Sequence, residues 1–451
     1  MKGDIVAMLQ VGCCVGSIAT NLVAEPIGRK KAIIIFAAIF IMGGIMQVAA
    51  QNLATMKAGR FFAGLGVGAC SALVPMYIAE TAPRKMRGRL GTTWQFLIVL
   101  GIMVSYFIDY GAKIHLTGTN QWRVPLGIQI VPGGILLIGM FFLPESLRWL
   151  AVKGQDDRVK QNLLKLRGCT ESDAAFQQEY HEILEGAAAD RDKDVFQLWK
   201  SLFTKNNLRR LGLGIMLQVF QQWTGTNAVN YYAPEIFQSS GLNTNNIDLI
   251  ATGVYGVVKV AFVFVSFFMV DTRLGRRRTL MIGSVVMFTA FFVLAGLIYG
   301  IQKENGGNLG TGVQAGAKGY AAMVMIYLFA VGYEFSWGPI PWICCSEIFP
   351  NNIRSLSLSI TTAFNWACNA VIAKVTPLMM TNITYGTYFF FGSMAVVMGV
   401  FVYFFLPETR GRSMEELNVL LDSGKVFVHN DQYVIDHERL ERDAEAGDYK
   451  E

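Results

Sequence analysis

The sequence predicts an all-α membrane protein of two pseudo-symmetric helical bundles, and three observations lead to this fold class. Of its 451 residues, 53% are hydrophobic and 16% are charged, whereas soluble globular domains carry about 25% charged residues. Apolar stretches long enough to cross a bilayer, about 20 residues each, recur along the chain. Three short phrases of the first half return in the same order in the second half, as expected of a duplicated bundle.

Eleven apolar stretches are the predicted spans. Five belong to an N-terminal bundle over residues 1–143, and six belong to a C-terminal bundle over residues 211–406. Residues 144–210 between them predict a cytoplasmic loop with short amphipathic helices, and residues 407–451 predict a charged, largely disordered tail. The stretches are 4–27, 32–52, 56–79, 90–110, 124–143, 211–234, 247–270, 279–300, 320–343, 355–377 and 385–406.

Basic residues divide the connecting loops into two sets. The loops at 28–31, 81–89 and 271–278 carry eleven Lys and Arg between them, and the loops on the opposite side carry four. Because cytoplasmic loops are enriched in Lys and Arg, we expect the chain to start outside and its C-terminus to be cytoplasmic. The net charge of +6 is explained by this distribution, and we expect no nucleic acid partner.

The internal repeat lies at the predicted cytoplasmic ends of spans. Its phrases are Gly28-Arg29-Lys30 with Gly275-Arg276-Arg277, Glu80-x-x-Pro83-x-x-x-Arg87 with Glu347-x-x-Pro350-x-x-x-Arg354, and Pro144-Glu145-Ser146 with Pro407-Glu408-Thr409. Matching the halves leaves the span at 211–234 without a counterpart in the first half. We therefore expect a twelve-span original whose first span is missing, through truncation or a misassigned start codon. A genuine eleven-span protein is the alternative.

No enzyme chemistry is indicated by the sequence. The seven Cys lie mostly inside apolar runs without metal-ligand spacing, and the four His lie outside the core spans or near their ends. No nucleophile and base constellation and no nucleotide-binding loop occurs. We expect no catalysis, no metal and no cofactor.

Longer phrases of the chain resemble the sugar porter family of the major facilitator superfamily, over essentially the whole length. These phrases are Gly59-Arg60 with Gly64, Gly66 and Gly68, Pro75 to Arg89, Pro144 to Leu150, Gln221 to Asn227, Gly338 to Trp342, and Pro407 to Gly411. These sequence motifs are most similar to those of fungal hexose, pentose and quinate permeases.

The resemblance implies the major facilitator fold, two six-helix bundles around a central site that opens alternately to each side. It implies transport of a monosaccharide by a protein that we expect to be a monomer in the plasma membrane. A permease for a cyclic or sugar acid, such as quinate or a uronate, is an alternative. A sensor that binds sugar without transporting it is another, although such sensors tend to have longer cytoplasmic tails than this chain.

Amide side chains in the span at 211–234 are the first candidates for binding a sugar. Gln218, Gln221 and Gln222 are spaced i, i+3 and i+4 and share one helix face, and Asn227 follows Gly225, where the helix can loosen. A sugar offers hydroxyls that donate and accept, which amides match. The alternative is hydrogen bonding between helices, worth on average about 0.6 kcal/mol per contact in membranes.

The resemblance adds further site residues. It places Gln95, Trp342, Asn365, Trp366 and Asn369 in the binding site and Tyr231 and Tyr232 in an outer lid, although the indoles can be packing residues and the tyrosines interface anchors. Cytoplasmic charges would bridge the bundles when the outside is open and separate when the inside opens. This gating set, with Arg60 of the third span added, comprises Arg29, Arg60, Glu80, Arg87, Glu145, Arg148, Arg276, Arg277, Glu347, Arg354, Glu408 and Arg410.

Two charged residues fall inside predicted spans, Lys259 and Glu334. A charge in mid-membrane costs roughly 2.5 to 3.5 kcal/mol on insertion scales, so each needs a partner or a function. Glu334 fits the family pattern, whereas Lys259 stands where glucose carriers of the family usually have Asn. Lys259 either pairs with Glu334, or snorkels, or receives a substrate carboxylate.

Proton coupling stays open at the level of sequence. In the family the proton-linked carboxylate lies in the first span, opposite Arg60, and that span is the one expected to be missing. Without it, the faces of Gln95 and Arg60 would lack a packing partner and Arg60 would lack an acidic partner. We therefore expect the chain to transport poorly until a first helix is restored.

Overall fold

The computed structural model describes residues 2–83, 87–188, 191, 195–239, 247–269, 274–306, 316–350, 353–409 and 421. These residues are almost entirely helical, and no strand occurs among them. Contacts divide the chain into two units, Met1–Ser201 with Asn352–Leu378, and Leu202–Asn351 with Met379–Glu451. Of the predicted tail, only Pro407, Glu408, Thr409 and Leu421 lie within the described residues.

The first unit contains the helices of the predicted N-terminal bundle, three short helices of the predicted loop and most of a helix from the second half of the sequence. Its helices are α1 (Lys2–Ile27), α2 (Arg29–Val48), α3 (Leu53–Thr81), α4 (Arg87–His115), α5 (Asn120–Ile128), α6 (Ile130–Phe142), α7 (Leu147–Val152), α8 (Asp156–Arg167), α9 (Ala174–Ala188) and, up to Leu378, α17 (Arg354–Asn382).

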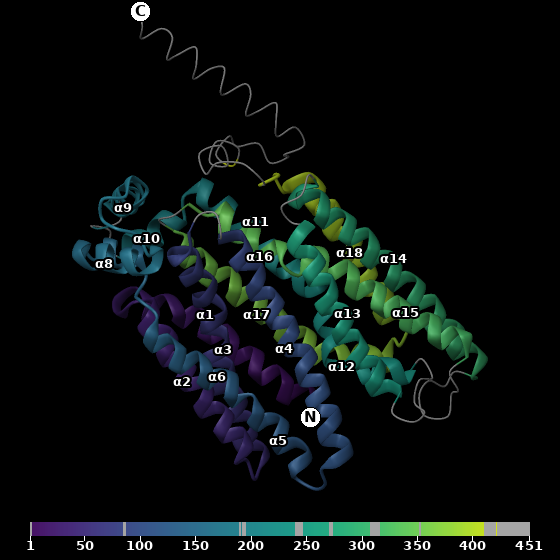
Figure 1. The fold of residues 1–451 in the computed structure, drawn as a ribbon. Helices are drawn as coiled ribbons and strands as arrows, with labels where there is room; N and C mark the ends of the chain where they lie inside the picture. Colours follow the sequence, from purple (N-terminus) through teal and green to yellow (C-terminus); the bar gives the residue numbers. More distant parts are fainter. Residues whose placement is uncertain are drawn as a thin grey trace, which may run out of the picture. The chain divides into compact units, whose positions relative to one another are not determined.

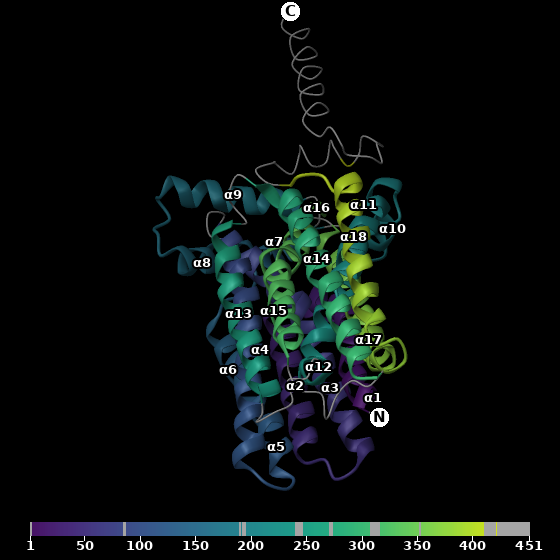
Figure 2. The same ribbon diagram turned by 90° about the vertical axis from the view of Figure 1, so that its right-hand side faces the viewer.

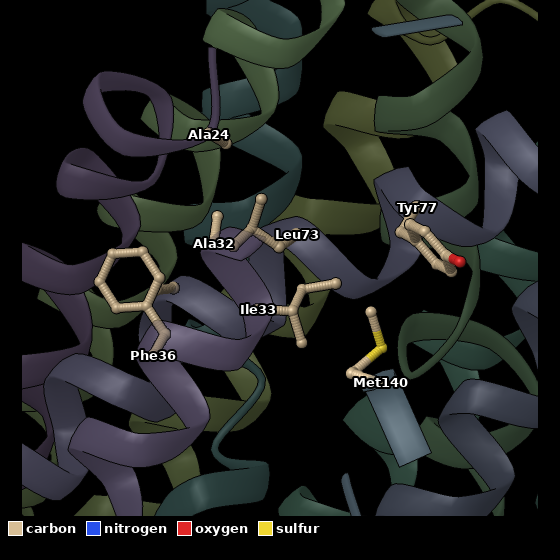
Figure 3. Close-up of a cluster of buried hydrophobic side chains, with 8 residues drawn as sticks. Ala24, Ala32, Ile33, Phe36, Leu73, Tyr77 and Met140 are labelled. Carbon is tan, nitrogen blue, oxygen red and sulfur yellow. The ribbon is translucent and has the colours of Figure 1, made fainter. Parts of the chain in front are cut away.

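Glycines let α3 approach α1 closely. A Cβ atom on Gly64 would lie 2.1 Å from the carbonyl oxygen of Leu9, and one on Gly68 would lie 2.0 Å from that of Cys13. Small residues allow such approach between helices in a membrane, where packing rather than water exclusion drives association. Ala32, Ile33 and Phe36 of α2 pack with Leu73 and Tyr77 of α3 in a buried cluster (Figure 3), which also includes Ala24 of α1.

The polar segment after α6 contains the short helices α7 to α9, with α10 (Val195–Leu202) after them. Leu147, Leu150, Val159, Leu163 and Phe176 form a small apolar core among α7, α8 and α9. Figure 1 shows α8 and α9 beside each other at one end of α1, α2 and α6. Trp149 Nε1 donates a hydrogen bond to the Glu25 carbonyl oxygen at 2.9 Å, which anchors α7 at the end of α1.

The second unit contains the remaining long helices. They are α11 (Lys205–Trp223), α12 (Thr226–Ser239), α13 (Ile247–Met269), α14 (Gly275–Glu304), α15 (Ala317–Gly332), a π-helix η1 (Tyr333–Trp337), α16 (Ile340–Ile348) and α18 (Gly386–Phe405). Figure 2 shows α14 running beside α15 and α18. Aromatic side chains fill these contacts, with the Phe291 and Phe329 rings stacked at 4.2 Å between centroids.

The helices agree with a chain that crosses a membrane many times. Among the described residues, nine helical segments are long and apolar enough to span a bilayer, and the apolar part of α13, Ile250–Ser266, is a shorter one. The predicted span at 211–234 corresponds to α11 and α12, which are separated at Thr224 and Gly225. Among the described residues, each of the eleven predicted spans thus overlaps with helix.

Candidate functional site

Gln218, Gln221 and Gln222 are all buried on α11. Gln221 Nε2 donates hydrogen bonds to the carbonyl oxygens of Trp337 and Gly338, each at 2.9 Å. In a regular helix the Trp337 carbonyl would accept from residue 341, but Pro341 has no N–H to donate. The amide of Gln221 therefore supplies a hydrogen bond that the broken helix lacks.

The helix break predicted at Gly225 is present. Gly225 has φ +86°, a conformation that favours glycine, and a Cβ atom there would lie 2.9 Å from the Phe391 ring. The Thr224 hydroxyl donates to the Gln221 carbonyl oxygen at 2.7 Å and accepts from the Thr226 N–H at 3.3 Å. This turn brings Asn227, the first amide of α12, back beside Gln222 of α11.

Side-chain amides form a connected series across this break. Asn227 Nδ2 donates to Gln222 Oε1, and Asn230 Nδ2 donates to Asn227 Oδ1 at 3.4 Å. The Tyr255 hydroxyl of α13 donates to Asn230 Oδ1 at 3.1 Å. Two amides that the sequence singled out are thus joined to a third, Asn230, which it did not.

Lys259 and Glu334 form a buried ion pair. Lys259 Nζ lies 2.9 Å from Glu334 Oε1, and the two side chains are 2% and 0% exposed. Lys259 Nζ also donates to Asn230 Oδ1 at 3.2 Å and lies 5.5 Å and 5.8 Å from the ring centroids of Tyr255 and Tyr333. The sequence left three interpretations of Lys259 open, and in the structure Lys259 pairs with Glu334.

Glu334 lies in a π-helical turn. The Gly338 N–H donates to the Tyr333 carbonyl oxygen five residues earlier, at 2.8 Å. Such turns are frequent at functional sites because they aim a side chain off the regular helical positions. The indole of Trp337 secures the turn by donating to Ser284 Oγ at 2.9 Å.

Three further residues predicted from the sequence, Trp342, Tyr231 and Tyr232, also lie in the second unit. Trp342 is half-buried on α16. The Tyr231 and Tyr232 rings meet edge to face at 6.4 Å, and Tyr232 is buried where α12 kinks, with φ −126° and ψ 21°. The role of Trp342 in the binding site and the role of the two tyrosines in an outer lid stay predictions.

Four predicted site residues lie in the first unit. Gln95 of α4 and Asn365 and Asn369 of α17 are buried, and the Trp366 indole donates to Ser71 Oγ of α3 at 3.0 Å. Four buried or anchored polar groups on two spans fit a polar site within a membrane bundle.

Arg60 is not the isolated cation expected from the sequence. It is half-buried on α3, and its charge interacts with the carboxylate of Asp109 on α4. Asp109 is not among the predicted residues, because the acidic partner of Arg60 was expected only in a span before α1.

The phrases repeated between the two halves of the sequence build one network in the first unit. Glu145 Oε1 accepts from the Lys30 N–H at 3.0 Å, at the N-terminus of α2. Arg29 lies between two acids, with Nη2 2.9 Å from Glu25 Oε1 and Nε 3.3 Å from Glu80 Oε2. The Ser146 hydroxyl donates to Glu80 Oε2.

The second unit repeats this network with the corresponding residues. Glu408 accepts from the Arg276 N–H at 2.9 Å and from the Arg277 N–H at 3.1 Å, at the N-terminus of α14. Arg276 Nη2 lies 2.8 Å from Glu347 Oε1, and its Nη1 donates to Thr409 Oγ1 at 3.4 Å.

Each contact named in these two networks joins residues of one unit. Arg148 and Arg354 are half-buried near the starts of α7 and α17, whereas Arg410 and the side chain of Arg87 lie outside the described residues. The gating role of the set stays a prediction.

The arrangement defines a class of protein. Polar side chains buried in long apolar helices, and helices broken where those side chains gather, are typical of transporters that bind a polar solute within the membrane. Residues 2–421 match the family model described as Sugar (and other) transporter. The chain belongs to this family of membrane transporters.

Similar proteins come from fungi and bacteria. A quinate permease of Emericella nidulans is 33% identical over 96% of this chain and 82% of its own length. High-affinity glucose transporter 1 of Candida albicans is 34% identical over 92% and 77%. These relatives are permeases and transporters, and the chain is likewise a transporter and not an enzyme.

Solved structures show the same fold. The proton:xylose symporter XylE of the major facilitator superfamily, bound to 6-bromo-6-deoxy-D-glucose, matches with a TM-score of 0.77, 28% identity and coverage of 93% of this chain and 89% of that chain. A partially occluded, inward-open conformation of XylE from E. coli matches with a TM-score of 0.74 and 27% identity over 91% and 88%. The chain therefore has the major facilitator fold.

Proposed function

We propose that this sugar transporter carries a monosaccharide, a hexose or a pentose, by alternating access in the plasma membrane, as a monomer with a cytoplasmic C-terminus. The observation that carries the proposal is the series of amides from Gln222 through Asn227 to Asn230. Amides offer donors and acceptors to neutral hydroxyls without placing a net charge in the membrane. The ion pair beside them is also neutral as a whole.

Gln222 and Asn227 are the residues proposed to hold the substrate. Gln221 and Gln218 differ from these two residues because their amide nitrogens contact other helices. Gln221 donates to backbone carbonyls, and Gln218 Nε2 contacts Cys345 Sγ at 3.7 Å. We propose that these two mainly hold α11 against η1 and α16. Gln95, Asn365, Trp366 and Asn369 are proposed as further substrate contacts.

Uptake of labelled D-glucose and D-xylose into cells that lack their own carriers tests the function. We expect Gln222→Ala and Asn227→Ala each to abolish uptake, because each removes a hydrogen bond to a desolvated hydroxyl, worth about 1 to 3 kcal/mol. Both variants should reach the membrane in normal amounts. Gln178→Ala, an exposed amide on α9, is the matched control and should transport normally. Unchanged uptake kinetics in both site variants would refute the assignment.

A cyclic acid is the second candidate substrate. Two observations favour it: several relatives are named quinate permeases, and a buried cation, Lys259, lies in the second unit. Against it stands the distance of 2.9 Å between Lys259 and Glu334, since an acid is already bound to that cation. Uptake of labelled quinate, measured beside the two sugars, separates the candidates.

Coupling to protons is proposed by analogy with the proton:xylose symporter. A protonophore added during uptake tests it directly. Accumulation that collapses when the proton gradient is removed identifies a symporter, whereas unchanged uptake identifies facilitated diffusion and contradicts this part of the proposal.

A further inference from the structure

The buried cation and three side-chain amides of the second unit form one continuous chain of hydrogen bonds. Lys259 Nζ donates to Asn230 Oδ1 at 3.2 Å, Asn230 donates to Asn227 at 3.4 Å, and Asn227 donates to Gln222. Asn230 is the link, because its oxygen faces the cation and its nitrogen faces the other amides. Asn230 thus joins the ion pair to Asn227 and Gln222.

The ammonium group of Lys259 determines which end of each amide donates and which accepts in this series of hydrogen bonds. A side-chain amide has a donating NH2 and an accepting oxygen, and a half-turn exchanges them with little change of shape. Lys259 has only donors, so Asn230 must turn its oxygen toward Nζ, and the Tyr255 hydroxyl donates to the same oxygen. The NH2 of Asn230 then faces Asn227, which must accept, and Asn227 in turn donates to Gln222.

The orientation of the Gln222 amide, at the end of this series of hydrogen bonds, is determined by that of Asn230 at its start. Because Gln222 Oε1 accepts from Asn227, its NH2 group is the end turned away from Asn227. Hydrogen bonds in such a chain also polarise one another when water is excluded. A half-turn of Gln222 alone would set two NH2 groups against each other.

We propose that Asn230 is a positioning residue through which the Lys259–Glu334 pair makes Gln222 present N–H donors, and not its oxygen, to the substrate. The substrate class that fits is a sugar or polyol with a hydroxyl that accepts a hydrogen bond at this point. The inference rests on the proposed function, since it requires that Gln222 contacts the substrate.

Fluorinated sugars test the proposal in the unmodified protein. A fluorine in place of a hydroxyl can accept but not donate a hydrogen bond, and a hydrogen can do neither. Monodeoxyfluoro and monodeoxy D-glucoses are compared as competitors of labelled D-glucose uptake. At one ring position we expect the fluoro sugar to compete within about threefold of D-glucose and the deoxy sugar to be weaker by about tenfold or more. Fluoro sugars that are everywhere as weak as their deoxy counterparts would overturn the proposal.

Two variants tie the pattern to Asn230. Asn230→Asp keeps the size but removes the donor, so Asn227 and then Gln222 must reverse, and the fluoro sugar should become as weak as the deoxy sugar at that position. Asn230→Val removes the hydrogen bonds between Lys259 and Asn227, and the difference in inhibition between the fluoro and the deoxy sugar, the gap, should shrink. Asn52→Asp, at the exposed N-cap of α3 where Asp caps equally well, is the control and should keep the wild-type gap.

The readout distinguishes a positioning role from a structural one. A purely structural Asn230 would lower uptake of all analogues by the same factor and leave their ratios unchanged, which would contradict the proposal. Size-exclusion profiles in detergent report folding, and if neither variant folds, the wild-type comparison decides. A wild-type protein that neither takes up D-glucose or D-xylose nor is inhibited by any analogue contradicts the proposed function itself, which is a separate outcome.

Discussion

Lys259 and Glu334 are each too costly to be left alone in a membrane bundle. Both are almost completely buried, and their side chains meet at 2.9 Å. Removing one partner of a buried pair strands the other charge, whereas removing both strands neither. The pair should therefore respond to mutation as a unit.

Lys259→Asn and Glu334→Gln are expected to lower the free energy of unfolding by about 3 to 5 kcal/mol when made singly. The double variant should recover most of this loss because no charge is left unpaired. Thermal unfolding of the purified proteins in detergent measures the three values. Losses that add up in the double variant would show that the two charges do not depend on each other.

The same variants separate a neutral from an acidic substrate. If the protein carries quinate, Lys259→Asn should reduce quinate uptake far more than D-glucose uptake, since a charge partner is lost from a low-dielectric site. The double variant should not restore it. Equal losses for both substrates would mean that Lys259 serves only as the partner of Glu334.

At the level of helices, the start of α2 and the start of α14 are built in the same way. Gly28 and Gly275 have φ values of +99° and +74°, and a Cβ atom on either would lie 2.4 Å from a carboxylate oxygen, that of Glu145 or of Glu408. The glycine is thus required twice, for its backbone conformation and for the space that it leaves to the acid. The acid in turn accepts from the N–H groups at the helix start, where negative charge is stabilising.

Gly28→Ala and Gly275→Ala should each destabilise the protein by about 1 to 3 kcal/mol through backbone strain alone, and further by displacing Glu145 or Glu408. Gly168→Ala is the matched control, since Gly168 has φ +61° with no atom within 4 Å of its Cβ position. It should suffer only the strain. Melting temperatures of the three variants test this, and equal shifts for Gly28 and Gly168 would rule out a role for the carboxylate.

Much of this local structure could be predicted from the sequence, and some could not. The helix break at Gly225 follows from local residue chemistry, so it was predicted. The π-helical turn at Tyr333–Trp337 was not, because it depends on Gln221, which is 116 residues from Trp337 along the chain. Asn230 could have been found, since it lies three residues after Asn227 on one helix face, but its partner Lys259 comes from another helix.

At the scale of the whole molecule, the internal repeat of the sequence appears as the same set of contacts within each of the two units. Arg29, Glu80 and Glu145 of the first unit correspond to Arg276, Glu347 and Glu408 of the second, and corresponding residues make corresponding contacts. The division into units by contact could not be predicted in the same way, because most of α17 groups with the first unit although it lies between two segments of the second unit in sequence. Long-range packing of this kind is not encoded in local patterns.

The orientation of the whole chain in the membrane rests on its basic loops. Eleven Lys and Arg lie in the loops assigned to the cytoplasm and four in the opposite loops, a bias that sets topology when it falls in short loops close to the spans. The chain between α4 and α5 and the end of α17 should then be outside, and α8 and α9 inside. Thr117, Thr381 and Ser172 are exposed positions in these three places.

Single cysteines at these positions test the orientation, in a variant whose seven native Cys are replaced by Ala and which still transports. A membrane-impermeant maleimide should label Thr117→Cys and Thr381→Cys in intact cells, because both are expected to face the outside. It should label Ser172→Cys only after the cells are permeabilised. The reverse pattern would invert the topology, and labelling of Thr117→Cys from both sides would mean that the basic loops do not determine it.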